Sequence, residues 1–133
     1  MIFTTYFAQL RNLPGSIVPI SICGRAPDWY TGLQYKKLAP KWAFFQEWKK
    51  NHDNNYYIEH FNAEVLAPLT AQQVVEELRS RLPDGAKDIA LVCYEKPNDF
   101  CHRHLVGKWL RENGIECREW EPEKYEQLRL GEN

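Results

Sequence analysis

The sequence has no long hydrophobic run and no secretory leader, and these two absences exclude two classes of protein. None of its stretches approaches the length of a membrane span. The N-terminal residues MIFTTYFAQLRNLPG have neither the basic start nor the continuous apolar core of a signal peptide. We therefore expect a cytoplasmic protein that does not enter a membrane.

The sequence has only four cysteines, Cys23, Cys93, Cys101 and Cys117, and no basis for a disulfide framework. In the reducing compartment expected here, cysteines are more often structural, catalytic or metal-binding thiols than parts of a disulfide framework. A chain of 133 residues can also bury roughly two thirds of its unfolded surface without a covalent staple. We expect reduced thiols in a single domain that spans residues 1–133.

The sequence also has no large excess of positive or negative charge, but its charged residues are unevenly distributed along the chain. The net charge is −1, whereas residues 1–50 hold seven Lys and Arg against two Asp and Glu. Over residues 29–50 the lysines alternate with aromatic residues, a mixture that can neutralise phosphates and stack bases, with Trp29 and Tyr30 as candidates for stacking. The alternative is an amphipathic helix whose apolar stripe includes Trp42, Phe45 and Trp48.

The apolar pattern predicts strands and helices that alternate in the second half of the chain. Strands are expected over residues 2–7, 17–23, 88–94 and 115–120, and helices over 41–50, 70–82 and 100–112. Thr70 and Gln73 form a capping box, residues 51–55 are a loop, and residues 56–65 fit a short strand or one or two helical turns. The alternation favours an α/β fold, a three-layer Rossmann-like domain with a mainly parallel sheet.

The stretch CYEKPNDFCHRHLVGKWL, residues 93–110, concentrates the chemically reactive side chains. It places Cys93 near the carboxyl end of an interior strand and Cys101, His102 and Arg103 in the first turn of the next helix. Ligands of open α/β sheets bind in the crevice outside such strand ends, and a helix N-terminus attracts anions. On a helical wheel His102 points inward, whereas His104 faces solvent.

These residue types indicate an anion site with adjoining chemistry. The fork of the Arg103 guanidinium matches a phosphate, and Arg25 follows Gly24 after an earlier strand, where glycine lets the backbone approach a ligand. Cys101 at the helix N-terminus is a candidate nucleophile. The structural alternatives are a buried Cys93, a His102 that only caps strand ends, and a solvated Arg25.

Glu95 has two possible roles in the same stretch. It can serve as a general base if burial raises its pKa, or it can form a structural ion pair with Arg103.

A metal centre is the competing interpretation of the same residues. Zinc on Cys93, Cys101, His102 and His104 needs two histidines that project to nearly opposite sides of one helix, and the spacing is not a usual one. A smaller zinc site of Cys93, Cys101 and His102, completed by Cys23 or His60, stays open.

The motif from Leu91 to Leu110 closely resembles the signature of the bacterial and phage family called domain of unknown function 488 (DUF488). In that family a strand ends in Cys-x-Glu, a proline follows, and Cys-His-Arg opens a helix that ends in Trp-Leu. Residues 21–42, SICGRAPDWYTGLQYKKLAPKW, resemble its compact branch, so the likeness covers residues 17–120. The resemblance implies a Rossmann-like fold without an assigned reaction, and its matching positions are Cys93, Glu95, Cys101, His102, Arg103 and, more weakly, Arg25.

Three functions follow as hypotheses. The first is an enzyme of nucleotides or nucleic acids that holds a phosphate with Arg103, Arg25 and Gly24 and acts through Cys101, His102, Glu95 and Cys93, without a cofactor. The second is a binding module for nucleic acid or a nucleotide signal that performs no catalysis. The third is a structural zinc protein. The sequence does not indicate the oligomeric state.

Overall fold

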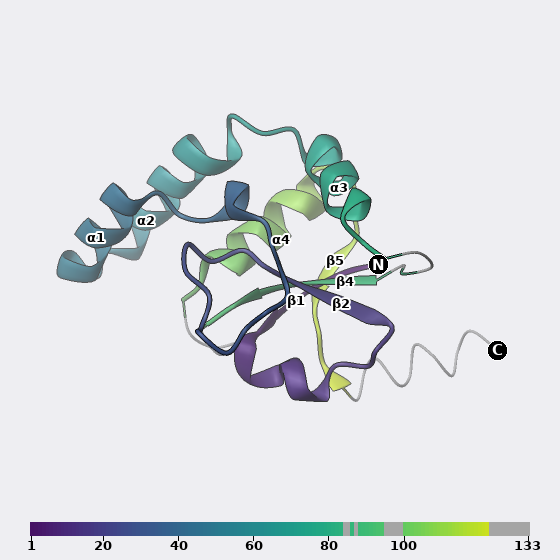
Figure 1. Cartoon of the computed structure of the whole chain (residues 1–133). Helices are drawn as coiled ribbons and strands as arrows, with labels where there is room; N and C mark the ends of the chain where they lie inside the picture. The colour runs from purple at the N-terminus through teal and green to yellow at the C-terminus, as the bar shows by residue number, and fades with distance from the viewer. Residues whose placement is uncertain (84–85, 87, 95–99, 123–133) are drawn as a thin grey trace.

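The computed structural model describes residues 1–83, 86, 88–94 and 100–122, which form an α/β fold around one parallel sheet (Figure 1). The strands are β1 (Ile2–Tyr6), β2 (Ile17–Ser21), β3 (Leu33–Gln34), β4 (Asp88–Cys93) and β5 (Cys117–Glu119). Their order is β3-β2-β4-β1-β5, and all four pairings are parallel. Because the strands run in one direction, their carboxyl ends share one edge of the sheet, and Cys93 ends the central strand at that edge.

The helices form the layers on either side of the sheet. The α-helices are α1 (Trp42–Asn51), α2 (Asn54–Phe61), α3 (Ala71–Ser80) and α4 (His102–Glu112), and the shorter turns are η1 (Phe7–Asn12), η2 (Lys36–Leu38) and η3 (Asn62–Leu66). In Figure 1 the four α-helices lie on one side of the sheet and η1 lies on the other. This arrangement confirms the predicted three-layer α/β class.

The core lies on both faces of the sheet because the side chains of a strand alternate between them. Along β4, Ile89 and Leu91 belong to the cluster beneath the helices, whereas Ala90 and Val92 belong to clusters on the opposite face. Ile89 through Cys93 are all fully buried, as the unbroken apolar run predicted for an interior strand.

The segment after α1 is more helical than the sequence indicated. His52 ends α1 in a left-handed conformation, and the Asp53 carboxylate then accepts hydrogen bonds from the Asn55 and Tyr56 backbone N–H groups and caps α2. The prediction of a loop over residues 51–55 was therefore too long, because the Asp53 cap was missed. The undecided residues 56–65 are helical, in α2 and η3.

Two smaller predictions also differ from the structure. Helix α3 begins after Thr70 as expected, but the Thr70 side chain makes no capping hydrogen bond, so the capping box does not form. The two-residue strand β3 was not predicted because it is too short to show an alternating pattern. Within the described part of the chain, every helix is too short or too polar to span a lipid bilayer.

Candidate functional site

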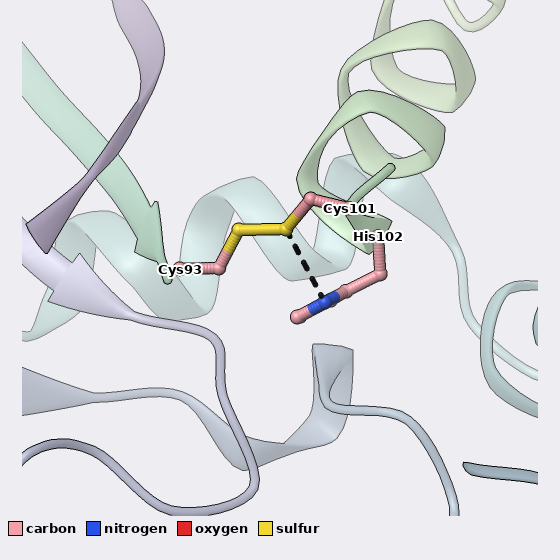
Figure 2. A group of neighbouring side chains, drawn as sticks. All are labelled: Cys93, Cys101 and His102. Carbon is pink, nitrogen blue, oxygen red and sulfur yellow. Dashed lines mark hydrogen bonds between the residues drawn. A yellow bond between two sulfur atoms is a disulfide. The ribbon is translucent and has the colours of Figure 1, made fainter. Parts of the chain in front are cut away.

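Cys93 and Cys101 meet at the carboxyl edge of the sheet, where the end of β4 faces the start of α4 (Figure 2). Their sulfur atoms are joined in a disulfide, and their Cα atoms lie 7.4 Å apart. The expectation of reduced thiols is therefore wrong for these two residues. The spacing of eight residues did not indicate the pairing, because only the strand-to-helix geometry brings the two side chains together. Cys23 and Cys117 are buried and outside any disulfide.

His102 is fixed in one tautomer by its surroundings. Its Nε2 lies 2.7 Å from the backbone carbonyl of Ile22, which can only accept, so Nε2 carries the proton. The other ring nitrogen, Nδ1, is then an acceptor and lies 3.8 Å from Cys101 Sγ. Burial lowers the pKa of His102 to about 4, with the Arg103 charge adding to the effect, so the ring is neutral at physiological pH.

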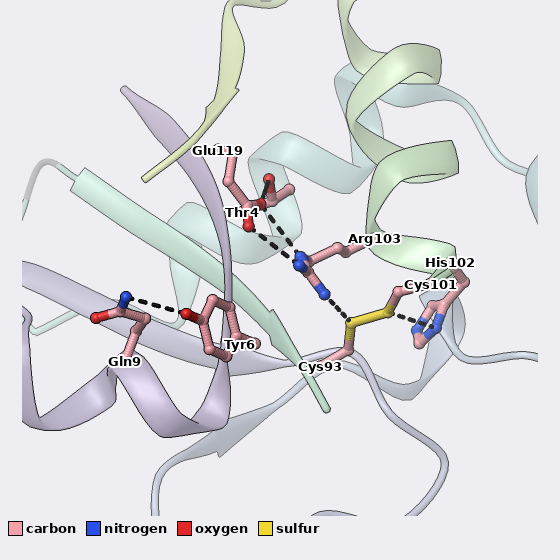
Figure 3. Close-up of polar contacts among 8 residues, drawn as sticks. All are labelled: Thr4, Tyr6, Gln9, Cys93, Cys101, His102, Arg103 and Glu119. Atoms are coloured by element: carbon pink, nitrogen blue, oxygen red, sulfur yellow. Dashed lines mark hydrogen bonds and ion pairs between the residues drawn. A yellow bond between two sulfur atoms is a disulfide. The ribbon is translucent and has the colours of Figure 1, made fainter. Parts of the chain in front are cut away.

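Arg103 is fully buried, and its guanidinium lies between Cys93 and Glu119 (Figure 3). Its Nε and Nη2 donate to the two carboxylate oxygens of Glu119 at 3.1 and 3.0 Å, and its Nη1 donates to Cys93 Sγ at 3.1 Å. The Thr4 hydroxyl donates to the same carboxylate at 2.7 Å. The guanidinium also lies 5.6 Å from the centre of the Tyr6 ring. Arg103 thus joins α4, β5 and β4 in one buried polar network.

This network gives Arg103 a different partner from those expected. Glu119 forms the ion pair that the sequence offered to Glu95, and Glu95 itself lies outside the described residues. Nothing in the sequence marked Glu119, because its place beside Arg103 depends on the parallel pairing of β5 with β1. A contact between Arg103 and a phosphate stays a prediction. The burial of the guanidinium does not favour that contact, because the group is closed off from a ligand in solvent.

A cavity of about 680 Å³ opens beside the histidine. Its lining residues are Cys23, Gly24, Arg25, Pro40, Trp42, Phe45, Gln46, Lys49, Tyr94 and His102. They come from the turn after β2, from Pro40 and α1, from the residue that follows β4 and from the start of α4. The expected crevice at the strand ends is therefore present, with Arg25 and Gly24 in its wall.

The charged and aromatic groups of the cavity are only partly those predicted. The side chain of Arg25 is 88% exposed and lies 3.8 Å from the Asp28 carboxylate, and Lys49 adds a second cation from α1. Arg103 is not among the lining residues, so the two arginines do not converge on this cavity.

The aromatic wall comes from α1 rather than from the predicted stacking pair. Trp42 is 76% exposed and lines the cavity with Phe45, whereas Trp29 and Tyr30 are absent from its lining. The Tyr30 hydroxyl donates to the Leu33 carbonyl at 2.6 Å, and the Trp29 ring packs edge-on against Phe7. Base stacking by Trp29 and Tyr30 stays a prediction. Trp42 is a further candidate for base stacking, although the sequence analysis placed it in the apolar stripe of a helix.

The three residues of the smaller zinc site are also adjacent. One donor atom each from Cys93, Cys101 and His102 lie within 4.8 Å of one another, and all three residues are buried. Cys23 lies on the same cavity as His102, whereas His60 contacts the Glu64 carboxylate at 2.6 Å. His104, expected to face solvent, is half-buried, with its Nε2 atom enclosed.

A family model described as the active DUF488-N3 subclade matches residues 9–114 of the chain. No curated protein and no solved structure matches it. The matched range includes β2, β4, all of α4 and every lining residue of the cavity.

Proposed function

This chain belongs to the DUF488 family, and we propose that it binds a phosphate-bearing ligand, a nucleotide or a nucleic acid, in the cavity at the sheet edge and acts on it through Cys101 and His102. The observation that carries the proposal is the composition of that cavity. It combines the cations Arg25 and Lys49 with the exposed ring of Trp42, above the neutral ring of His102.

Each of these groups suits one part of such a ligand. Arginine and lysine side chains recognise phosphate oxygens, and their attraction is strongest where the cavity walls exclude water. The face of an exposed tryptophan stacks on a base without requiring a particular sequence. A cavity of about 680 Å³ is also within the range of small-molecule sites.

The chemical part of the proposal requires Cys101 as a thiol. The unprotonated Nδ1 of His102 accepts the thiol proton, and the Cys101 sulfur then attacks an electrophilic centre of the ligand with its lone pair. The bond to the leaving group breaks, the bonding electrons depart with that group, and the imidazolium returns the proton to it. The word "active" in the family description supports a catalytic site.

The binding part is tested by a pair of variants that lose the same charge. In Arg25→Gln/Lys49→Gln the cavity loses both cations, whereas Lys36→Gln/Lys50→Gln removes two exposed lysines that do not line it. We expect the first variant to bind nucleoside phosphates and a short single-stranded oligonucleotide at least about tenfold more weakly by calorimetry, and the second to stay within about twofold. Binding by wild type should also weaken as salt rises. Equal losses in both variants, or no binding by wild type, would contradict the proposal.

The catalytic part has a separate readout. Cys101→Ser and His102→Asn should keep ligand binding and abolish conversion of the bound ligand, followed by mass spectrometry. Binding without turnover in reduced wild-type protein would favour the non-catalytic module over the enzyme.

A structural zinc site is the second candidate, because Cys93, Cys101 and His102 already bring three donor atoms within 4.8 Å. The hydrogen bond from His102 Nε2 to a backbone carbonyl is the support that metal-binding histidines usually have. Elemental analysis of protein purified under reductant decides this candidate. About one zinc per chain, lost in Cys101→Ser, supports it, and less than a tenth of a zinc per chain rules it out.

A further inference from the structure

We infer that Cys93 and Cys101 form a reversible two-electron dithiol/disulfide couple that controls the candidate site, with Cys101 as the sulfur that exchanges and Cys93 as the sulfur that leaves. The control of catalysis rests on the proposed function, because it is the Cys101 thiol that the catalytic step needs. The couple itself rests on the surroundings of the two sulfur atoms, which differ in access and in charge.

The two sulfurs differ first in access. Cys93 is completely buried at the end of β4. Cys101 has 4% of its surface exposed to solvent and lines a small cavity of about 20 Å³ with His102 and Phe100. An attacking thiolate must approach along the axis of the sulfur–sulfur bond, so it reaches Cys101 first and expels Cys93.

They differ also in electrostatics. The Arg103 guanidinium donates from Nη1 to Cys93 Sγ at 3.1 Å and carries a full positive charge. A thiolate at Cys93 is therefore stabilised by a charge-assisted hydrogen bond, which makes Cys93 the better leaving group. Cys101 lies beside the unprotonated Nδ1 of His102, which can take up or return a thiol proton. The surroundings of the pair thus assign a separate role to each sulfur.

The exchange needs an external reductant, and a low-molecular-weight thiol is sufficient. Its thiolate attacks Cys101 Sγ, the disulfide breaks, and the bonding electrons pass to Cys93, which becomes a thiolate beside Arg103. A second thiolate attacks the external sulfur of the mixed disulfide, releasing Cys101 and an external disulfide. Two external thiols are oxidised and the pair is reduced by two electrons, with protons taken from solvent.

The state of the couple decides whether Cys101 is chemically available. In the disulfide, Cys101 has neither a thiol proton nor a free thiolate and cannot attack a ligand. Arg25 and Lys49 line the cavity and belong to neither sulfur, so the redox change does not alter their charges. The oxidised protein should therefore bind the ligand without converting it, and reduction should restore conversion.

The couple is tested on the full chain in buffers of reduced and oxidised dithiothreitol, followed by acid quenching, alkylation with a mass tag and peptide mapping. We expect two tags to appear together on Cys93 and Cys101 as the buffer becomes reducing, and the change to reverse on reoxidation. Two thiols that persist in excess oxidised dithiothreitol, a pairing with Cys23, or about one zinc per chain that prevents oxidation would each overturn the inference.

Arg103→Lys tests the asymmetry, with Arg111→Lys as its control. Arg111 donates to the Cys117 carbonyl and touches neither sulfur of the pair. Loss of the guanidinium contact destabilises the reduced state, so the equilibrium of Arg103→Lys should move about tenfold toward the disulfide, against less than twofold for the control. An unchanged equilibrium contradicts the role of Arg103.

If Arg103→Lys does not fold, Cys101→Ser keeps Arg103 and leaves Cys93 as a single thiol. Thiolate absorbance at 240 nm and pH 8 should then exceed that of Cys93→Ser, in which Cys101 is the remaining thiol of the pair, and equal absorbance in the two variants overturns the role of Arg103. Nucleotide binding, measured in both redox states, separates the two proposals. Absence of binding rejects the proposed function and leaves the couple standing, whereas absence of exchange rejects the couple and leaves binding intact.

Discussion

Arg103 and Glu119 form a two-point ion pair between α4 and β5, with Nε–Oε1 and Nη2–Oε2 distances of 3.1 and 3.0 Å. Arg103 is fully buried and the Glu119 side chain is 18% exposed, so water screens the pair only weakly. The pair fixes the guanidinium whose third side reaches Cys93 Sγ. A contact deep in the fold therefore sets the environment of a sulfur at the sheet edge.

Removing the charge of Glu119 should be costly for the fold. Glu119→Gln leaves the buried Arg103 without its counter-charge, and we expect it to lower the free energy of unfolding by about 3 kcal/mol, measured by urea denaturation. Glu116→Gln is the matched control, because Glu116 pairs with Arg118 on the surface and should change stability by less than about 1 kcal/mol. Equal effects in the two variants contradict the importance of the buried pair.

The sequence predicted the elements more reliably than the contacts between them. Cys93 and His102 were correctly placed at a strand-to-helix junction. The apolar run of residues 88–94 and the apolar stripe of the following helix were sufficient for this, since both patterns depend only on local periodicity. The Glu119 contact and the cavity wall of Trp42 and Lys49 depend on how distant segments meet, which no local pattern contains.

The reactive residues show the same division between local and distant information. The inward direction of His102 was predicted, because helix geometry fixes it relative to Leu105, Val106 and Leu110. Its tautomer depends on the Ile22 carbonyl, which is 80 positions away in sequence. The disulfide was not predicted, because a reducing compartment favours free thiols and the sequence does not show that Cys93 and Cys101 face each other.

Acid should destabilise the protein through His102. Its pKa is about 4 in the fold and close to 6.5 when unfolded, so the unfolded chain binds the proton more readily between these values. Unfolding then takes up a proton, and stability falls as pH drops through 6.5 toward 4, by on the order of 3 kcal/mol over the window. Thermal denaturation across this range should show a flatter pH dependence for His102→Gln than for the wild type. A wild-type slope in His102→Gln contradicts a neutral, buried His102.

The two exposed tryptophans should differ in their effect on ligand binding. Trp42 lines the cavity, whereas Trp29 packs against Phe7 on another part of the surface. If the ligand stacks on Trp42, Trp42→Ala should weaken nucleotide binding by about tenfold, since one stacked base contributes roughly 1–3 kcal/mol. Trp29→Ala should stay within about twofold in the same calorimetric titration. The reverse ranking supports stacking by Trp29 and Tyr30 and places the base elsewhere.

Cys117 should be unreactive for as long as the protein is folded. It is 3% exposed in β5, and burial raises its pKa to about 11, so almost none of it is thiolate at pH 8. Because the thiolate is the form that alkylates, iodoacetamide should leave Cys117 unmodified in folded protein and label it after denaturation in guanidinium chloride. Peptide mapping before and after denaturation measures this difference. The sample should be the protein with its Cys93–Cys101 disulfide intact, since those two sulfurs then consume no iodoacetamide. Rapid labelling of Cys117 in the folded chain would show that β5 separates from β1 on the timescale of the reaction.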